Sequence, residues 1–216
     1  MIDDLDGYCE RLGPGLWAEP LNAATNLAFV LAALGMAGRA RGMALPLGLC
    51  AVLGLIGAGS GLFHTVAKGW AALADVIPIL LFILAYLYAA NRHYLMQSPL
   101  RALLLTAGFV PYAAVSVPLF ALIPGIGSSA GYAPVPLLIL IYAGLVRGRL
   151  PVVARGLAIG AGLLILSLVA RTLDMPLCPQ FPYGTHFIWH LMNALMLALM
   201  IETLIRHMAS PVKALP

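Results

Sequence analysis

Two histidines stand four residues apart in the apolar stretch THFIWHLMNA, which covers residues 185–194. On a helix, His186 and His190 would share one face, because residues at i and i+4 are neighbours along that face. An ionisable side chain is costly in a segment apolar enough to enter a membrane, so it is a candidate for function. Two imidazoles on one rigid helix could supply two ligands to a metal ion, and a third ligand would come from another helix.

A second stretch, SGLFHTVAKGWAALAD at residues 60–75, offers the missing groups. Ser60 and His64 are four residues apart near the end of one apolar run, and Asp75 opens the next run. Three neutral imidazoles with an open fourth position form a catalytic Zn²⁺ arrangement, which lowers the pKa of water and polarises a carbonyl group. Asp75 could then take a proton from the attacking water, and Ser60 could donate a hydrogen bond to the developing oxyanion. These residues predict a zinc hydrolase.

An HxxxH spacing by itself is weak evidence for a metal site. It arises easily by chance, and an intramembrane histidine often only hydrogen-bonds a neighbouring helix. The prediction therefore depends on whether the fold brings all five groups to the same depth in the membrane.

The composition places the chain in a membrane. Hydrophobic residues make up 62% of its 216 residues and charged residues 9%, and the mean hydropathy is +0.98. We expect one all-α domain over residues 1–216, a bundle of seven membrane-spanning helices, because each span needs roughly 20 apolar residues. The basic residues are scattered at the ends of apolar runs, which argues against a nucleic-acid partner. The predicted helices lie near residues 21–39, 44–63, 71–90, 101–121, 132–147, 152–170 and 184–206.

The distribution of charge predicts the orientation of these spans. Nine of the twelve basic residues fall on one side, which the positive-inside rule makes cytoplasmic. The N-terminus, including an extracytoplasmic segment over residues 1–20, then lies outside, and the C-terminus lies inside. Ser60, His64, Asp75, His186 and His190 all come to the outer leaflet. With its short loops, the chain is expected to be a multi-pass protein of a bacterial inner membrane.

At these residues the chain resembles the alkaline ceramidase family, within the superfamily of seven-span membrane hydrolases that includes adiponectin-receptor-like proteins. The block of a serine, a histidine four residues on and an aspartate eleven beyond it is reproduced by Ser60, His64 and Asp75. The final HxxxH, with a tryptophan before its second histidine, is similar to the segment 186–190. A third block, near the N-terminus, is similar to Tyr8, Cys9 and Glu10 followed by Ala18, Glu19 and Asn22.

The resemblance implies a zinc site of His64, His186 and His190, with Ser60 and Asp75 as catalytic groups. It also implies hydrolysis of the amide bond of ceramide (N-acylsphingosine), a membrane lipid, to a sphingoid base and a fatty acid.

The same resemblance implies a calcium site near the N-terminus, where this chain departs from the family pattern. Gly7 and Leu12 stand where the family has an aspartate and an asparagine. Ca²⁺ prefers six to eight oxygen ligands. The remaining oxygens would come from Asp6, the Tyr8 carbonyl, Glu10 and Glu19. The alternative is a solvated acidic segment with Glu19 near the start of a helix, and both interpretations stay open.

Cys9 and Cys178 are both expected on the outer side, where a disulfide persists. The family has a comparable bridge between the N-terminal segment and the last outer loop, so the resemblance implies that these two cysteines are bonded.

Other functions fit part of the sequence. The same zinc chemistry could act on another acyl lipid, because nothing in the sequence recognises a sphingoid base in particular. A seven-span lipid receptor could hold a non-catalytic zinc ion. A metal transporter fits less well, because transport sites lie near the midplane of the membrane. The sequence leaves the acyl-chain preference and the oligomeric state open.

Overall fold

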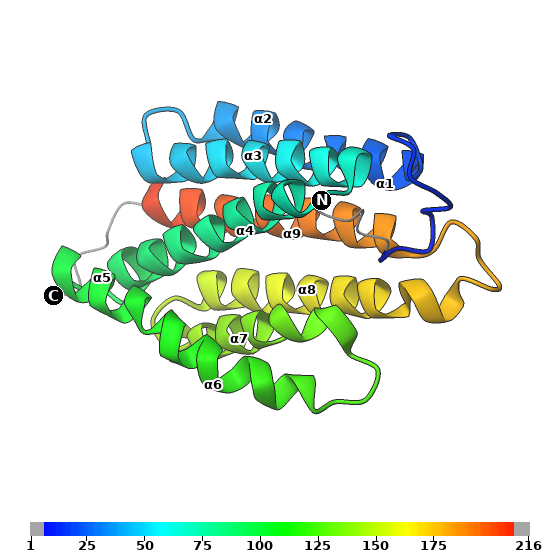
Figure 1. Cartoon of the computed structure of the whole chain (residues 1–216). Helices are drawn as coiled ribbons and strands as arrows, with labels where there is room; N and C mark the ends of the chain where they lie inside the picture. Colours follow the sequence, from blue (N-terminus) through cyan, green and yellow to red (C-terminus); the bar gives the residue numbers. More distant parts are fainter. Residues whose placement is uncertain (1–6, 210–216) are drawn as a thin grey trace, which may run out of the picture.

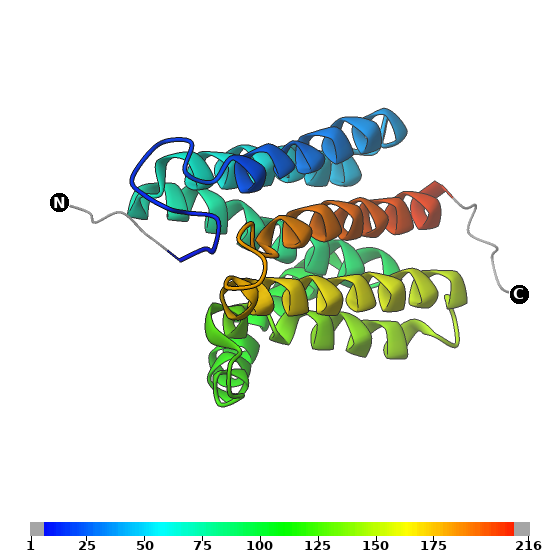
Figure 2. The ribbon, with the colours of Figure 1, turned by 90° about the vertical axis from the view of Figure 1, so that its right-hand side faces the viewer.

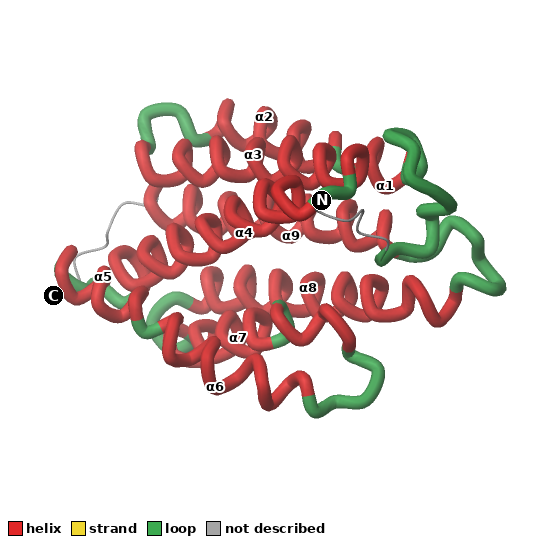
Figure 3. Tube along the Cα trace, in the orientation of Figure 1, coloured by secondary structure: helices red, strands yellow, loops and turns green. Residues whose placement is uncertain are grey.

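Every regular element in the described part of the chain, residues 7–209, is a helix in the computed structural model (Figures 1 and 3). In chain order these are α1 (Pro20–Thr25), α2 (Leu27–Arg39), α3 (Ala44–Val66), α4 (Gly69–Ala89), the π-helix η1 (Ala90–Tyr94), α5 (Pro99–Ala107), α6 (Phe109–Ala121), the 3₁₀ helix η2 (Gly127–Gly131), α7 (Pro134–Val146), α8 (Pro151–Leu177) and α9 (His186–Ala209).

Seven segments of this series are long and apolar enough to cross a membrane. The prediction of an all-α, multi-pass protein with seven spans is therefore confirmed. Which end of the bundle faces the outside stays a prediction. The spans are Pro20–Arg39, Ala44–Val66, Gly69–Tyr94, Pro99–Ala121, Gly127–Val146, Pro151–Leu177 and His186–Ala209.

Two predicted spans are interrupted where the backbone hydrogen bonds change. The first span breaks at Asn26, whose side-chain amide donates to the carbonyl of Asn22 while its backbone N–H bonds to Ala23. Such local bonds compete with the regular helical pattern. The fourth span breaks at Gly108, and Pro111 just beyond it has no N–H for the carbonyl of Ala107.

The third and sixth spans extend furthest past their predicted ends. The third continues past residue 90 through η1 to Tyr94, whose ring is fully buried and whose hydroxyl lies 2.9 Å from that of Tyr86. The sixth was expected to end at residue 170, but α8 continues to Leu177. Asp174, which lies beyond the predicted end of this span, is therefore a buried residue of α8. Its carboxylate accepts hydrogen bonds from backbone N–H groups of the N-terminal segment and of the start of α9, and these bonds hold the end of α8 against both segments.

The last helix lies at the centre of the bundle. In Figures 1 and 2, α9 runs between a layer formed by α2 and α3 and a layer formed by α7 and α8. It packs against α2, α3 and α8. Of the 18-residue apolar stretch in α9, 56% of the residues are buried inside the protein, whereas the corresponding share for the span Pro99–Ala121 is 11%. The histidines of α9 are therefore held by neighbours on several sides.

Glycines allow the closest helix approaches. A Cβ atom on Gly59 would collide with the backbone of Ala74, so α3 and α4 meet at a distance that only glycine permits. This contact sets Ser60, the next residue of α3, beside Asp75, the next residue of α4. A second close approach joins α8 to α9, where added Cβ atoms on Gly156 and Gly160 would strike side chains of α9.

Candidate metal centre

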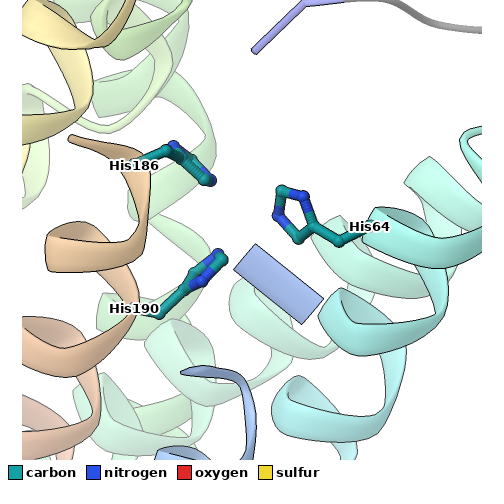
Figure 4. Close-up of side chains that lie close together, drawn as sticks. All are labelled: His64, His186 and His190. Carbon is teal, nitrogen blue, oxygen red and sulfur yellow. The ribbon is translucent and has the colours of Figure 1, made fainter. Parts of the chain in front are cut away.

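His64, His186 and His190 face one another, as Figure 4 shows, although the first comes from α3 and the others from α9. One ring nitrogen from each lies within 4.8 Å of those of the other two. The ring centroids are 4.7 Å apart for His186 and His190 and 5.1 Å apart for His64 and His186. All three side chains are at most 2% exposed. The fold therefore brings together the three histidines that the sequence predicted as ligands.

Glu19 fixes the orientation of His64. Its Oε2 lies 2.6 Å from Nδ1 of His64, so the imidazole donates there and keeps Nε2 for a ligand. Its Oε1 accepts from Nε of Arg11 at 2.5 Å, and Nδ2 of Asn22 donates to Oε2. Burial alone would raise the pKa of Glu19, but the bonds from His64 and Arg11 outweigh it and hold that pKa below its ordinary value. Glu19 is therefore a carboxylate acceptor for the imidazole of His64.

Thr25 plays the corresponding part for His190. Its Oγ1 lies 2.9 Å from Nδ1 of His190 and 2.8 Å from the carbonyl oxygen of Leu21. A hydroxyl has one proton, and Thr25 donates it in a hydrogen bond to the carbonyl oxygen of Leu21, because a carbonyl oxygen can only accept hydrogen bonds. The threonine oxygen then accepts from Nδ1 of His190, which leaves Nε2 of that ring unprotonated.

His186 opens α9, and its position is set by the backbone. Oδ1 of Asp174 accepts from the N–H groups of Thr185, at 2.7 Å, and His186, at 2.9 Å. Oδ2 of the same carboxylate accepts from the N–H of Cys9 at 2.9 Å. Asp174 thus caps the start of α9 and ties it to the N-terminal segment.

A disulfide between Cys9 and Cys178 closes the same region, with Cα atoms 5.4 Å apart. The predicted bridge is confirmed. Gly184, just before α9, has φ of +63°, and an added Cβ there would collide with the carboxylate of Asp174 and with Cys9. The turn into α9 therefore requires glycine.

The unpaired atoms of this cluster fit a metal ion. Within residues 7–209, Nε2 of His64, Nε2 of His190 and Nδ1 of His186 are buried without a hydrogen-bond partner. A buried polar atom without a partner is costly, so each of these nitrogens needs an explanation. Neutral imidazole nitrogens with their other nitrogen held by an acceptor are typical ligands of zinc. His64 and His190 have this arrangement, and His186 brings a ring nitrogen within 4.8 Å of theirs, so the residues present fit Zn²⁺.

Ser60 and Asp75 lie beside this cluster. Both line a hollow that also touches Phe29, Tyr132 and Trp189. The carboxyl group of Asp75 lies near the Ser60 hydroxyl and within the electrostatic reach of His64. All five residues predicted for the hydrolase centre therefore come from three helices to one end of the bundle.

The ring of Tyr8 covers the histidines. Its centroid is 4.0 Å from that of His186 and 5.0 Å from that of His64. Burial raises the pKa of the Tyr8 phenol well above its ordinary value, so the hydroxyl stays neutral. The N-terminal segment thus closes one side of the centre, where the resemblance had implied only a backbone carbonyl for calcium.

The calcium site stays a prediction, and the structure gives its residues other partners. Glu10 accepts from the backbone N–H groups of Leu21, at 2.6 Å, and Asn22, at 2.8 Å, at the start of α1. Both oxygens of Glu19 are bonded as described above. Asp6 lies outside the described residues.

Sequence reasoning missed several residues around the histidines. Glu19 was considered for calcium and not as a partner of His64, and Arg11, Thr25 and Asp174 were not considered for the site. One general signal was available: ligand histidines almost always donate their second nitrogen to a carboxylate, carbonyl or hydroxyl group. A search for acids expected at the outer end of the bundle would have found Glu19.

Comparison of the chain with models of known protein families gives no match, and comparison with curated protein sequences gives none either. The resemblance to the alkaline ceramidases therefore stays a prediction that depends on the residues quoted for it.

Proposed function

We propose that this chain is a zinc-dependent hydrolase of the membrane, which cuts the amide bond of an acyl lipid. His64, His186 and His190 would hold the ion. The observation that carries the proposal is the set of three buried histidines with one ring nitrogen each within 4.8 Å of the others, in which Nε2 of His64 and Nε2 of His190 are unpaired on rings fixed by Glu19 and Thr25. A zinc ion with three histidine ligands supplies a nucleophile from water near neutral pH and polarises a carbonyl group.

The residues beside the histidines have the types that hydrolysis needs. Asp75 would accept a proton from the attacking water and pass it to the leaving amine. The Ser60 hydroxyl would donate a hydrogen bond to the carbonyl oxygen as negative charge develops there. Gly59 supports this pairing, because the close contact of α3 with α4 sets both groups at one edge of the hollow.

The shape of the interior favours a lipid. The hollow beside Ser60 and Asp75 shares part of its wall with a second hollow, deeper in the bundle, and both are lined almost entirely by apolar side chains. An apolar hollow with a few polar groups at one end fits an acyl chain with its carbonyl carbon at that end. The shared wall consists of Phe82, Ile83, Val135, Met196 and Leu197.

Ceramide is the leading substrate, on the strength of the resemblance, and the products would be a sphingoid base and a fatty acid. Another acyl lipid remains the alternative. The charge distribution supports a site towards the extracytoplasmic leaflet of a bacterial inner membrane.

The test is fatty-acid release by the purified, zinc-loaded protein from a panel of N-acylsphingosines and other acyl lipids. His186→Ala removes a ligand and should abolish both turnover and tight zinc binding. Asp75→Asn keeps the three ligands, so it should abolish turnover while bound zinc, measured by mass spectrometry, stays near one per chain.

Two outcomes would overturn the proposal. Turnover by Asp75→Asn at the wild-type rate would remove the assigned proton acceptor. Full zinc occupancy without turnover on any lipid of the panel would favour the receptor with a non-catalytic zinc ion.

A further inference from the structure

Arg171 lies near the outer end of α8, and the hydrolytic mechanism leaves it unused. Its guanidinium carbon is 5.4 Å from the ring centroid of Tyr132, 5.5 Å from that of Trp189 and 6.0 Å from that of Tyr8. An arginine at the end of a span usually extends towards the lipid head groups. Here three aromatic rings surround the charge and hold it beside the metal centre.

No carboxylate in the described part of the chain forms an ion pair with Arg171. Asp174, one helical turn further on, has both oxygens occupied by backbone N–H groups. A guanidinium group carries five N–H donors that lie in its plane. The faces of aromatic rings stabilise its positive charge but do not accept hydrogen bonds from these donors. Arg171 therefore presents N–H groups that could donate hydrogen bonds to an oxyanion.

Arg171 also stands between two hollows. The outer one has a volume of about 210 Å³ and is lined by Tyr8, Gly127, Ser128, Ser129 and Arg171 itself, among others. The inner one contains Ser60 and Asp75, and its wall includes Tyr132 and Trp189, two of the rings that hold the guanidinium. A lipid with its scissile bond at Ser60 and Asp75 would therefore place its polar end within reach of Arg171.

We propose that Arg171 binds an oxyanion on the polar end of the lipid substrate, so that the enzyme prefers acyl lipids that carry a phosphate or carboxylate group over neutral ones. This preference favours the alternative substrate, another acyl lipid, over ceramide, which is neutral. The inference rests on the proposed hydrolase function for its identification of the ligand as a substrate. Arginine suits such a group, because its planar fork donates two parallel hydrogen bonds to a phosphate or carboxylate. Serine hydroxyls of the outer hollow would add further donors.

The test measures binding without turnover. Trp189 lies against Arg171 and reports on it by fluorescence, once the exposed Trp17 and Trp70 are replaced by phenylalanine. The zinc-loaded, full-length protein is titrated with dodecyl phosphate, dodecanoate and dodecanol in a neutral detergent. We expect dodecyl phosphate to bind at least about tenfold more tightly than dodecanol. Arg171→Gln should abolish this difference, Arg171→Lys should keep part of it, and Lys68→Gln, on an exposed cation at the same end of the bundle, should leave it unchanged.

Three results would overturn the inference. Equal binding of dodecyl phosphate and dodecanol by the wild-type protein would show that no oxyanion site exists. An unchanged preference in Arg171→Gln would assign the anion to the metal or to another cation. Arginine-dependent binding of dodecanoate alone would assign the site to the fatty-acid product and not to the substrate's polar end.

The outcome is separable from that of the hydrolase proposal. A protein that binds dodecyl phosphate through Arg171 but releases no fatty acid from any lipid would refute hydrolysis and leave the oxyanion site standing. A protein that hydrolyses neutral and anionic lipids equally, with or without Arg171, would refute the substrate preference alone.

Discussion

Replacement of Thr25 by valine isolates one hydrogen bond of the metal centre. Valine keeps the shape and the β-branching of threonine but removes the hydroxyl that lies 2.9 Å from Nδ1 of His190. Without this acceptor, His190 can take either tautomer and can rotate. We therefore expect Thr25→Val to lower the affinity for zinc while the fold is kept.

The size of the effect follows from the chemistry of the acceptor. Loss of a group that orients a ligand histidine lowers metal affinity by about 10–100-fold. The threonine hydroxyl is neutral, and a neutral hydrogen bond contributes about 0.5–1.5 kcal/mol. The expected loss lies at the lower end of that range, near tenfold, which corresponds to about 1.4 kcal/mol of zinc binding energy.

The assay is competition for zinc against a chelator of known affinity, with folding checked by thermal unfolding of the zinc-free protein. Thr65→Val is the matched control: this threonine is adjacent to His64, but its hydroxyl donates only to carbonyls of its own helix. Thr25→Ser restores a hydroxyl and should restore affinity. Zinc affinity within twofold of wild type in Thr25→Val, or an equal loss in Thr65→Val, would refute the assignment.

Three further predictions concern residues around the site. Glu19→Gln should weaken zinc binding more than Thr25→Val, by up to about 100-fold, because the acceptor lost by His64 is charged; equal losses in the same competition assay would contradict this. Gly184→Ala should lower the free energy of unfolding by about 1–3 kcal/mol, because alanine is strained at this backbone conformation and collides with Asp174. Denaturant unfolding measures the change, and Gly162→Ala, where a Cβ meets no atom within 4 Å, should show no such loss. Cys178→Ser should lower the stability by about 2–5 kcal/mol through loss of the disulfide, and an unchanged melting temperature would refute that contribution.

Prediction from the sequence succeeded where a local pattern carried the information. Apolar runs of sufficient length predicted the seven spans, because any helix that crosses a membrane needs such a run, whatever the fold. It failed at the ends of helices: α8 extends seven residues past its predicted end at residue 170, to Leu177. No local pattern showed that Asp174 would be buried and bonded to Cys9 and Thr185, residues brought near it only by the fold.

The candidate site likewise has features that the sequence predicts and features that depend on the packing of helices. The sequence by itself determined the types of the candidate ligands and the HxxxH spacing, because helical periodicity sets His186 and His190 on one face before any packing occurs. Only the tertiary structure decided which nitrogens are available. The ring orientation of His64 depends on Glu19, 45 residues away along the chain, and that of His190 depends on Thr25, 165 residues away. Such contacts arise from the packing of whole helices, which the spacing of residues along one helix does not specify.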